Sequence, residues 1–435
     1  MAREQVEKPL GDIYDFRSGL SKAASEFGSG YPFLTFKDVF YNAFVPDELG
    51  DLVNSTEAER SACDIKRGDV FLTRTSETMD ELGMSCVALR DVPFATFNGF
   101  TKRLRPKPGA EIVPEYAGYF FRGPQFRRNV TAMSSLSTRA SLNNDMLARL
   151  RMSLPSMAVQ ASIGDTLKSL DNKIGHNRKT GRLLEQLARA IYRAWFVDFE
   201  PVKAKVAGAS YFCTMPQRIF DDLPSCLIDS EIGPIPQGWV TKPLSSVCTL
   251  VSGGTPKRSE PSYWHGDVPW YSVKDAPDNG DVWVIRTSEQ ITEDGVTNSA
   301  ARIVPKGCTI ISARGTVGKL AMAGTSMAFN QSCYGLLPID GASFSHLYLL
   351  MQTVVADLQR RTHGSVFDTI TRSTFDGLMV VSPPSDVVSS FEGVVSPLFA
   401  LSLSLREEST RLAEIRDYLL PRLLGGSVYV EANDD

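Results

Sequence analysis

The chain has 435 residues, of which 43% are hydrophobic and 22% charged, and its formal net charge is −4. This is the composition of a globular protein that is long enough for two or three domains. No run of about 18 apolar residues occurs, and the N-terminal segment MAREQVEKPL is charged where a secretory signal needs an apolar core, so we expect a cytoplasmic protein.

The cysteine pattern and the charge distribution narrow the function further. Seven dispersed cysteines without a C-x-x-C pair predict reduced, mostly buried thiols rather than a disulfide framework or a zinc finger. The negative net charge argues against nucleic-acid binding on average, yet residues 92–151 carry ten basic and three acidic side chains. That segment is either a solvated face or a local phosphate-binding field, and composition leaves both open.

The first half of the chain begins with short strand-like runs, such as residues 69–73 (DVFLT), bounded by Gly, Pro and Asn. From residue 163 the period changes, and apolar positions advance by alternating steps of four and three. This spacing predicts a long helix with a coiled-coil seam. The seam positions are Ile163, Leu167, Leu170, Ile174, Asn177, Gly181, Leu184, Ala188, Ile191 and Trp195, of which Asn177 and Gly181 are the weak points.

The second half follows the same plan. Strand-like runs such as residues 308–312 (CTIIS) precede a second helix with heptad spacing, in which Pro397 predicts a kink or a restart. The seam positions of this helix are Phe391, Val394, Leu398, Leu401, Leu405, Glu408, Leu412, Ile415 and Leu419.

The two halves also share residues in the same order. Lys8-Pro9-Leu10 and Ser18-Gly19 recur at one constant offset as Lys242-Pro243-Leu244 and Ser252-Gly253. Further matches are Lys37-Asp38 with Lys274-Asp275, Arg67-Gly68 with Lys306-Gly307, Phe97-Asn98 with Phe329-Asn330, and Arg127-Arg128 with Arg360-Arg361. Any one match could be chance, but their shared order indicates an internal duplication.

We therefore predict an α+β (mixed α/β) protein. Two similar domains are separated by two long helices that form an antiparallel coiled coil, with an approximate two-fold relation. The predicted parts are a first domain (1–155), a central helix (156–200), a linker (201–234), a second domain (235–384), a C-terminal helix (385–426) and an acidic tail (427–435).

No catalytic motif is complete. Residues 26–30 (EFGSG) resemble the glycine loop that binds S-adenosylmethionine, but a strand-like run follows where a helix belongs. Residues 313–320 (ARGTVGKL) approach a P-loop, yet they lack its first glycine and its final hydroxyl residue. Asp47 with Asp64 and Lys66 fits only a loose nuclease pattern, and the four histidines have no ligand-like spacing. We predict neither catalytic residues nor a metal site.

Three segments resemble the specificity (S) subunit of Type I restriction-modification systems. They are residues 183–205 (LLEQLARAIYRAWFVDFEPVKAK), residues 252–270 with SGGTP and YWHGDVPW, and residues 416–426 (RDYLLPRLLGG). The resemblance spans essentially the whole chain. It implies two target recognition domains, each reading one half of a bipartite, asymmetric site on double-stranded DNA, and two conserved helices that set the spacer.

The resemblance also implies that the chain is not an enzyme and holds no cofactor. Two methyltransferase subunits, which use S-adenosylmethionine to methylate adenine at N6, are expected to dock on it. Restriction subunits, which use ATP and Mg²⁺ to translocate and cleave DNA, are expected to join them.

Basic and amide residues near expected loop ends are the candidate DNA contacts, because arginine suits guanine, and asparagine or glutamine suits adenine. They are Lys22, Lys37, Arg74, Asn98, Arg127, Arg128, Arg139, Lys257, Arg258, Lys274, Arg314, Lys319, Asn330, Gln331, Arg360, Arg361 and Arg372. The candidate subunit interface is Leu183, Leu187, Tyr192, Trp195, Phe196, Tyr418, Leu420 and Leu423, although several of these could instead fill the helix seam.

Two other classes of function stay open at this point. One is a single-chain methyltransferase or nuclease with a hidden site near residues 27–30 or near Asp47 and Lys66. The other is a coiled-coil adaptor without a role on DNA. Within residues 253–275, Trp264 and Trp270 are expected in the core, and Lys257-Arg258 near DNA phosphates.

Overall fold

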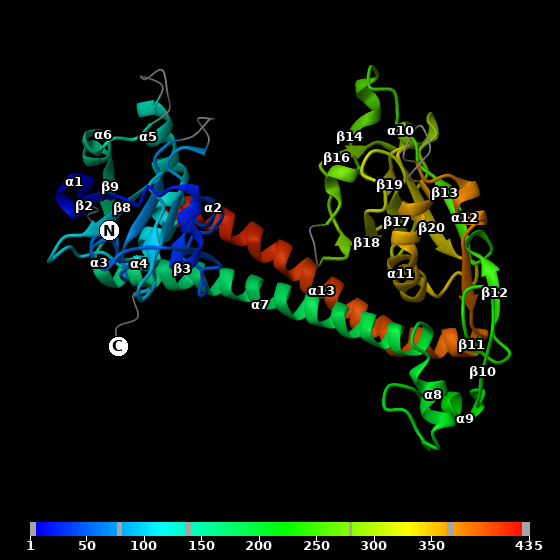
Figure 1. The fold of residues 1–435 in the computed structure, drawn as a ribbon. Coiled ribbons are helices and arrows are strands. Elements are labelled where there is room, and N and C mark those ends of the chain that lie inside the picture. Colours follow the sequence, from blue (N-terminus) through cyan, green and yellow to red (C-terminus); the bar gives the residue numbers. More distant parts are fainter. Residues whose placement is uncertain (1–5, 76–80, 135–140, 278–280, 363–368, 429–435) are drawn as a thin grey trace. The chain divides into compact units, whose positions relative to one another are not determined.

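The structure is a computed structural model, which describes residues 6–75, 81–134, 141–277, 281–362 and 369–428. The chain forms two compact units (Figure 1). Unit 1 comprises residues 1–174 and 411–435, and unit 2 comprises residues 175–410. Each unit contains one globular domain and part of each of the two long helices, so each is described by itself.

The domain of unit 1 is built from three small sheets. β1 pairs with β9, a four-stranded sheet has the order β2-β8-β5-β6, and a three-stranded sheet has the order β4-β3-β7. The elements are β1 (Val6–Pro9), α1 (Leu10–Ile13), β2 (Tyr14–Ser18), η1 (Ala24–Glu26), β3 (Phe27–Leu34), α2 (Phe36–Tyr41), β4 (Asp51–Val53), α3 (Glu57–Ala62), β5 (Val70–Thr73), β6 (Ser85–Val87), β7 (Thr96–Phe97), β8 (Thr101–Pro106), α4 (Pro114–Arg122), α5 (Pro124–Ser134), α6 (Asn144–Arg149) and β9 (Arg151–Leu154).

The domain of unit 2 repeats this topology with one added strand. β12 pairs with β21, a five-stranded sheet has the order β13-β20-β17-β18-β15, and a three-stranded sheet has the order β16-β14-β19. The elements are β12 (Val240–Pro243), η3 (Leu244–Ser246), β13 (Cys248–Ser252), η4 (Pro261–Tyr263), β14 (Trp264–Tyr271), η5 (Val273–Asp275), β15 (Trp283–Val284), β16 (Glu289–Ile291), α10 (Glu293–Thr297), β17 (Thr309–Ser312), β18 (Leu320–Ala323), β19 (Ala328–Phe329), β20 (Cys333–Pro338), α11 (Phe344–Thr362), α12 (Arg372–Asp376) and β21 (Met379–Ser382).

The residues that recur in the sequence hold the same turns in both domains. Gly19 and Gly253 each pass so close to a backbone carbonyl, of Phe97 and Asn330 respectively, that a Cβ would overlap it. Asp38 and Asp275 each close a capping box on the residue three positions earlier. The predicted duplication is thus confirmed, and its shared residues build the scaffold.

The two long helices are α7 (Met157–Phe196) and α13 (Ser385–Leu424), and they run antiparallel. In unit 2 the Asn177 amide donates to Glu408 over 2.7 Å, and the Ser402 hydroxyl donates to Glu185 over 2.8 Å. These pairs run in opposite directions along the two helices, as an antiparallel coiled coil requires. The predicted fold class is therefore confirmed, and the weak point at Asn177 is a hydrogen-bonded contact between the helices.

The predicted seam of α7 is largely correct, whereas that of α13 is shifted. On α7, Ile163, Leu167, Ile174, Ala188 and Trp195 are buried. The buried positions of α13 are Val387, Phe391, Val395, Phe399, Ser402, Leu403, Ser409 and Leu423, whereas the predicted seam residues Leu401 and Ile415 are exposed. The helix also continues through Pro397 without the predicted restart.

The shift has a physical reason, because α13 is apolar on more than one side. Phe391, Val395 and Phe399 face the core of unit 2, while Ser402 and Ser409 face α7. By length and composition α13 could cross a membrane, and it is the one such helix in the part of the chain that the structure describes. Part of its apolar surface is buried against the core of unit 2.

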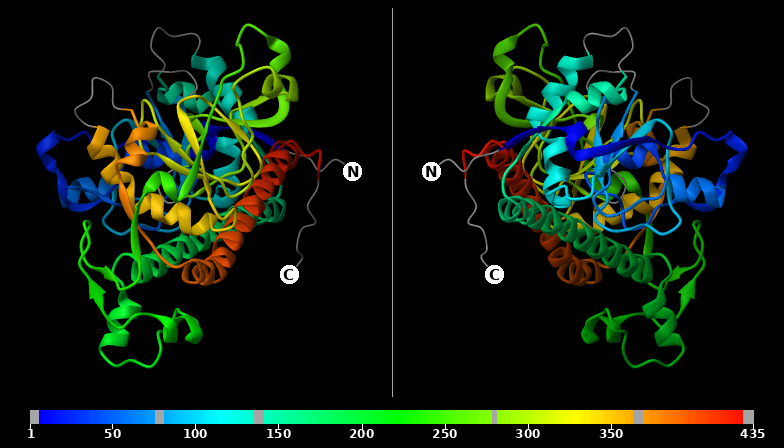
Figure 2. Two further views of the ribbon diagram at one scale, coloured as in Figure 1. Left: turned by 90° about the vertical axis from the view of Figure 1, so that its right-hand side faces the viewer. Right: turned by 90° about the vertical axis from the view of Figure 1, so that its left-hand side faces the viewer.

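Residues 201–234, predicted as a linker, fold onto unit 2. They form α8 (Glu200–Val206), α9 (Gln217–Asp222) and β10 (Leu227–Ile228), and β10 pairs with β11 (Ile235–Pro236) at the end of α7 (Figures 1 and 2). Val202, Ile219 and Phe220 join the largest hydrophobic cluster. The Pro- and Gly-rich composition concealed these apolar anchors, because they are spaced too irregularly to show a period.

Candidate nucleic-acid interface

In unit 2, four loops meet at one edge of the five-stranded sheet. Ser252 at the end of β13 lies opposite Tyr334, and Ser312 at the end of β17 lies opposite Cys333. The antiparallel register therefore brings residues 253–258, 313–319 and 330–332 to the same edge, and residues 369–372 join them through an Arg314–Thr369 bridge. We call these four segments loop edge 2.

Loop edge 2 gathers seven of the predicted DNA contacts, which are Lys257, Arg258, Arg314, Lys319, Asn330, Gln331 and Arg372. Arg314, Lys319, Gln331 and Arg372 are all exposed there. The Arg314 amide donates to the Ser332 carbonyl over 3.2 Å, and the Thr255 hydroxyl donates to the Gln331 side chain. Three cations and an amide on neighbouring loops form a surface that suits phosphates and base edges.

Unit 1 has the equivalent edge. Ser18 at the end of β2 lies opposite Lys102, and Thr73 at the end of β5 lies opposite Thr101. Residues 19–22, 74–75, 98–102 and 141–144 meet there, and we call them loop edge 1. Of the predicted contacts, Lys22, Arg74 and Asn98 belong to it.

Sequence reasoning missed three residues of loop edge 1. The Lys102 amine donates to the Asn144 side chain over 2.8 Å, and burial, followed by the nearby Arg74 charge, lowers the pKa of Lys102. Phe100 lies at the tip of the turn and is 61% exposed. The exposure of this aromatic ring beside two cations becomes visible only in the folded structure, and the sequence alone does not indicate it.

Two predicted base-reading amides have structural roles. The Asn98 side chain accepts a hydrogen bond from the Phe100 amide over 2.7 Å, and the Asn330 side chain accepts one from the Ser332 amide over 3.1 Å. Each asparagine thus stabilises the turn at the tip of its loop edge. The prediction that these two side chains also contact DNA stays a prediction, and only their oxygen atoms are engaged by these turns.

Several predicted cations are engaged within the chain. The Lys22 amine lies 2.9 Å from Glu59, and the Arg128 guanidinium lies 2.7 Å from the Gln125 side chain. Arg360 pairs with Asp357 one helical turn away. Arg127 is half-buried and donates to the Leu82 carbonyl, so part of its guanidinium is already engaged within unit 1.

Three further candidates have no side-chain hydrogen bond or ion pair among the described residues, and two others lie wholly or partly outside those residues. Lys37 and Lys274 are exposed at equivalent positions inside the two capping boxes, one residue before Asp38 and Asp275. Lys257 is exposed on the loop after β13. Arg139 lies outside the described residues, and so does the side chain of Arg361.

The basic segment 92–151 is largely structural. Arg103 and Arg105 pair with Asp64 at 2.9 Å each, and Arg105 also binds Asp69 at 2.6 Å. The Arg122 guanidinium donates to four carbonyls, three of them at α2, over 2.8–3.1 Å. The local excess of positive charge therefore does not form one continuous DNA-binding strip.

The same contacts give Asp64, one of the acids in the loose nuclease pattern, a role in ion pairs. Although burial acts to raise it, the pKa of Asp64 is lowered by the guanidinium groups of Arg105 and Arg103 and by Lys66. Asp64 is thus an ion-pair partner. No group of three or more His, Cys, Asp or Glu side chains that could hold a metal occurs among the described residues.

The aromatic segment after β13 is mainly core, as expected. Trp264 and Trp270 are buried edge to face with ring centroids 5.2 Å apart, and the Trp270 indole donates to the Gly254 carbonyl over 3.0 Å. The Arg258 guanidinium carbon lies 3.8 Å from the centroid of the Trp264 ring, and the same guanidinium donates to the Glu289 carboxylate over 2.9 Å. Its charge is therefore partly neutralised, which weakens its claim on a phosphate.

Comparison with known proteins identifies the family of this duplicated scaffold. The model of the Type I restriction modification DNA specificity domain matches twice, at residues 3–186 and 236–387. The chain belongs to this family. The DNA-specificity role predicted from the sequence is thereby confirmed, together with the interpretation that the chain is a recognition component rather than an enzyme.

Relatives of this specificity family span nearly the whole chain. The Type I restriction enzyme HindI specificity subunit of Haemophilus influenzae is 25% identical over 448 residues, which cover 92% of this chain and 95% of the relative. The MjaIX specificity subunit of Methanocaldococcus jannaschii is 23% identical and covers 98% of this chain and 93% of its own. The crystal structure of an S subunit from M. genitalium has the same fold, with a TM-score of 0.61 at 12% identity over 99% of this chain and 97% of that one.

The predicted subunit-interface residues of this specificity chain fall into two groups. Leu183 and Leu187 on α7 and Tyr418 on α13 are 56%, 48% and 59% exposed. Leu420 is half-buried. These four stay candidates for contact with a partner.

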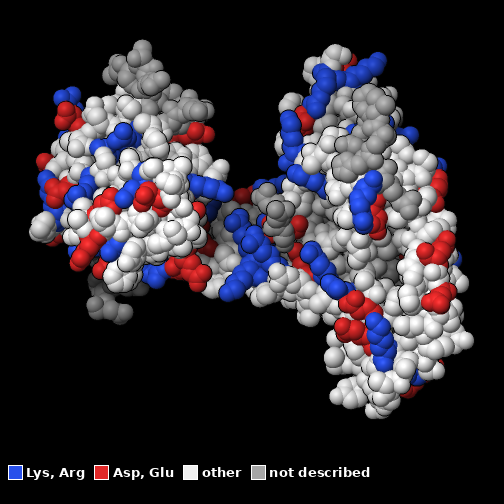
Figure 3. All heavy atoms as spheres, viewed as in Figure 1, with Lys and Arg blue, Asp and Glu red and all other residues white. Residues whose placement is uncertain are grey.

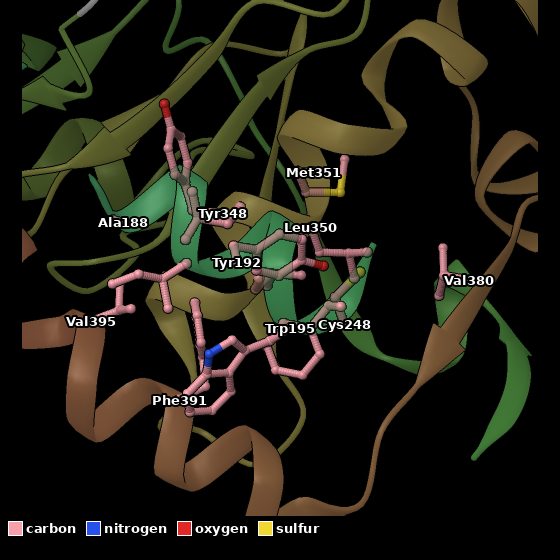
Figure 4. Close-up of a cluster of buried hydrophobic side chains, with 14 of the residues drawn as sticks. Ala188, Tyr192, Trp195, Cys248, Tyr348, Leu350, Met351, Val380, Phe391 and Val395 are labelled. Carbon is pink, nitrogen blue, oxygen red and sulfur yellow. The ribbon is translucent and has the colours of Figure 1, made fainter. Parts of the chain in front are cut away.

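The other four interface candidates are corrected, because they lie in the chain's own core. Tyr192, Trp195 and Phe196 pack around Phe391 of α13, as the close-up of this core shows for Tyr192 and Trp195 (Figure 4). Leu423 is buried in the cluster of unit 1. Their spacing along the helices was compatible both with the helix seam and with a surface for a partner subunit. In the structure they are buried within the chain.

Proposed function

We propose that this chain reads a split, asymmetric site on double-stranded DNA, with one half-site bound at each loop edge. The observation that carries the proposal is the repetition of one scaffold with different residues at equivalent tips. Two copies of a reading surface suit two half-sites, and their differences suit an asymmetric sequence.

The tips show this difference most clearly. The asparagine-anchored turns carry Gly99-Phe100 at loop edge 1 and Gln331-Ser332 at loop edge 2, so the two tips differ at both positions. An exposed phenylalanine suits the methyl group of thymine, and a glutamine amide suits the N6 and N7 positions of adenine. The surrounding cations, such as Arg74 and Arg314, suit phosphates or guanine.

The chain would carry no catalytic group and would act as an assembly point. Exposed Leu183, Leu187 and Tyr418 support docking of two methyltransferase subunits on the long helices. S-adenosylmethionine would belong to those subunits, which methylate adenine at N6. ATP and Mg²⁺ would belong to the restriction subunits, and the assembly would act in the cytoplasm.

The test is to purify the chain together with its methyltransferase partner and to map the modified adenines on random DNA. We expect one motif made of two short parts separated by a fixed number of unspecified base pairs. Methylation without a split motif would contradict the proposal. Cofactor binding or DNA cleavage by the chain alone would favour the single-chain enzyme instead.

A matched pair of variants tests the loop edge itself. Arg314→Ala with Arg372→Ala removes two cations of loop edge 2, and we expect DNA affinity to fall about tenfold or more. Lys306→Ala is the control, because Lys306 is also exposed but lies before β17, at the opposite edge of the sheet. Equal affinity of both variants would show that DNA does not lie on loop edge 2, whereas an adaptor without a DNA role would show no sequence-specific binding at all.

A further inference from the structure

A β-bulge recurs at the same place in both domains. In β3, Phe27 and Tyr31 both lie opposite Val53, so three residues bulge out between them. In β14, Trp264 and Val268 both lie opposite Ile291 in the same way. Bulges of this kind re-aim side chains and are frequent next to functional sites.

The two bulges carry different residues. Domain 1 has Gly28-Ser29-Gly30, and domain 2 has His265-Gly266-Asp267. Gly28 adopts φ 93°, and His265 at the equivalent position adopts φ 64°. Glycine reaches this left-handed region freely, but a histidine does so at the expense of backbone strain.

In the part of the chain that the structure describes, no side-chain hydrogen bond compensates the strain at His265. Its side chain is exposed and makes no hydrogen bond or ion pair with any of the described residues. A strained residue without an internal partner suggests that the side chain is held for something outside the chain.

His265 lines a hollow of about 540 Å³ together with Arg258, Pro261, Trp264 and residues 287–290. Gln290 is exposed in the same hollow, and its amide also has no hydrogen-bond partner among the described residues. The wall is fixed, because Arg258 is clamped between the Trp264 ring at 3.8 Å and the Glu289 carboxylate at 2.9 Å. Two uncommitted polar side chains therefore stand on a rigid frame.

The hollow adjoins the basic side of unit 2. Lys257 and Arg258 are the last residues of the first segment of loop edge 2, on the side toward β14. Lys274 lies close enough to Glu289 to lower the pKa of that carboxyl, after the larger effect of Arg258. Lys and Arg side chains gather along the β14 and β16 side of this unit (Figure 3). A DNA backbone near these cations would place base edges within reach of the hollow.

We propose, building on the proposed function, that His265 and Gln290 are a base-reading pair for the half-site bound by the second domain. Gln290 contacts the N6 and N7 edge of an adenine in the major groove, and the His265 imidazole contacts the neighbouring base. Domain 1 has Gly28 and Leu52 at the two equivalent positions, so its bulge cannot make these contacts. The pair thus contributes to the asymmetry of the site.

The test gives domain 2 the residues of domain 1. The variants His265→Gly and Gln290→Leu are assembled with the methyltransferase partner, and modified adenines are mapped on a library of random duplexes. We expect each variant to lose about tenfold in preference at one or two adjacent positions of one half-site, with the other half-site unchanged. The Tm of His265→Gly should not fall, because glycine relieves the strain.

His176→Ala is the control, since His176 is an exposed histidine on α7 and should leave the motif unchanged. His265→Asn keeps a polar side chain in a residue that tolerates positive φ, and we expect an altered rather than a lost preference. Unchanged motifs in both His265 variants and in Gln290→Leu would overturn this proposal while leaving the split site intact. A wild-type assembly without a split motif would instead overturn the proposed function.

Discussion

The two recognition domains differ in how they hold the same topology. Domain 1 fixes its small helix α2 with the half-buried guanidinium of Arg122, which donates to four carbonyls. Domain 2 has Val355 at the equivalent place on α11, where it packs into the hydrophobic cluster. One domain thus uses charged hydrogen bonds where the other uses apolar packing, although the strand order is unchanged. The shared turns and helix caps specify the scaffold, whereas the side chains that pack between them can differ in the two domains.

The largest effect should come from Arg122→Ala. The change leaves four carbonyls without their donor, so we expect unit 1 to lose about 3 kcal/mol of its free energy of unfolding. Hydrogen–deuterium exchange should show faster exchange of α2 and its neighbours, with unit 2 unchanged. Arg128→Ala is the control, because Arg128 is exposed on the following helix. Equal effects of the two variants would contradict the structural role of Arg122.

A matched pair of glycine variants tests what the domains share. Gly19→Ala and Gly253→Ala should destabilise their own domains by similar amounts, about 2 kcal/mol or more, because each Cβ would overlap a carbonyl oxygen. Peptide-level hydrogen exchange measures the two domains separately. Gly175→Ala is the opposite control: it lies in α7 with open space around it and should stabilise the helix by up to about 1 kcal/mol. A large effect in one domain only would show that the two turns are not equivalent.

These glycines also show how much of the fold can be predicted from the sequence. Gly19 and Gly253 recur in register with the other shared residues, so the duplication was visible in the chain itself. The seam of α13 was not, because Val395 and Phe399 and the predicted Val394 and Leu398 are equally apolar, and only packing on two sides separates them. When a helix packs against one neighbouring element, its apolar periodicity identifies the seam. When it packs against two, as α13 does, the periodicity does not distinguish the two faces.

The candidate site was less accessible to sequence reasoning. Charge identifies Lys22 and Arg360 as cations, but not that Glu59 and Asp357 lie beside them. His265 was noticed only as one of four scattered histidines, since neither its positive φ nor the hollow beside it exists before the chain is folded. Turn chemistry is local and can be read from the chain, whereas pairing and strain depend on residues brought together by the fold.

The long helices offer a second comparison, which Glu185→Gln would sharpen. In unit 1, Asp171 of α7 is bound by Tyr119 and Arg416 at 2.7 Å each. In unit 2, burial raises the pKa of Glu185 to about 7, against the hydrogen bond from Ser402, and Asp281 raises it further while Arg189 and Arg182 lower it. The carboxyl of Glu185 is thus stabilised in its neutral form.

The sign of the pH dependence follows from this raised pKa. The folded chain holds a proton on Glu185 that the unfolded chain loses near pH 4.5, so the stabilisation is complete below pH 4.5 and is lost as the pH rises through about 7. Glu185→Gln keeps an acceptor for Ser402 without the charge, and we expect it to stabilise unit 2 by about 1–3 kcal/mol at pH 8 and hardly at pH 4. Denaturation of both forms across this pH range measures the difference. A constant difference at all pH values would show that Glu185 stays ionised.

The smallest expected effect compares Lys37 with Lys274, which occupy equivalent positions within the two capping boxes. Each exposed amine would neutralise one phosphate of its own half-site without reading a base. Lys37→Ala and Lys274→Ala should therefore each weaken binding uniformly across sequences and reduce the slope of log affinity against log salt by about 1, with the methylated motif unchanged. Salt titrations of the assembled complex give this slope. Because the two lysines stand on one repeated scaffold, a change in slope for only one of them would mean that DNA approaches the two domains differently, and the asymmetry would then extend from the bases that are read to the backbone that is held.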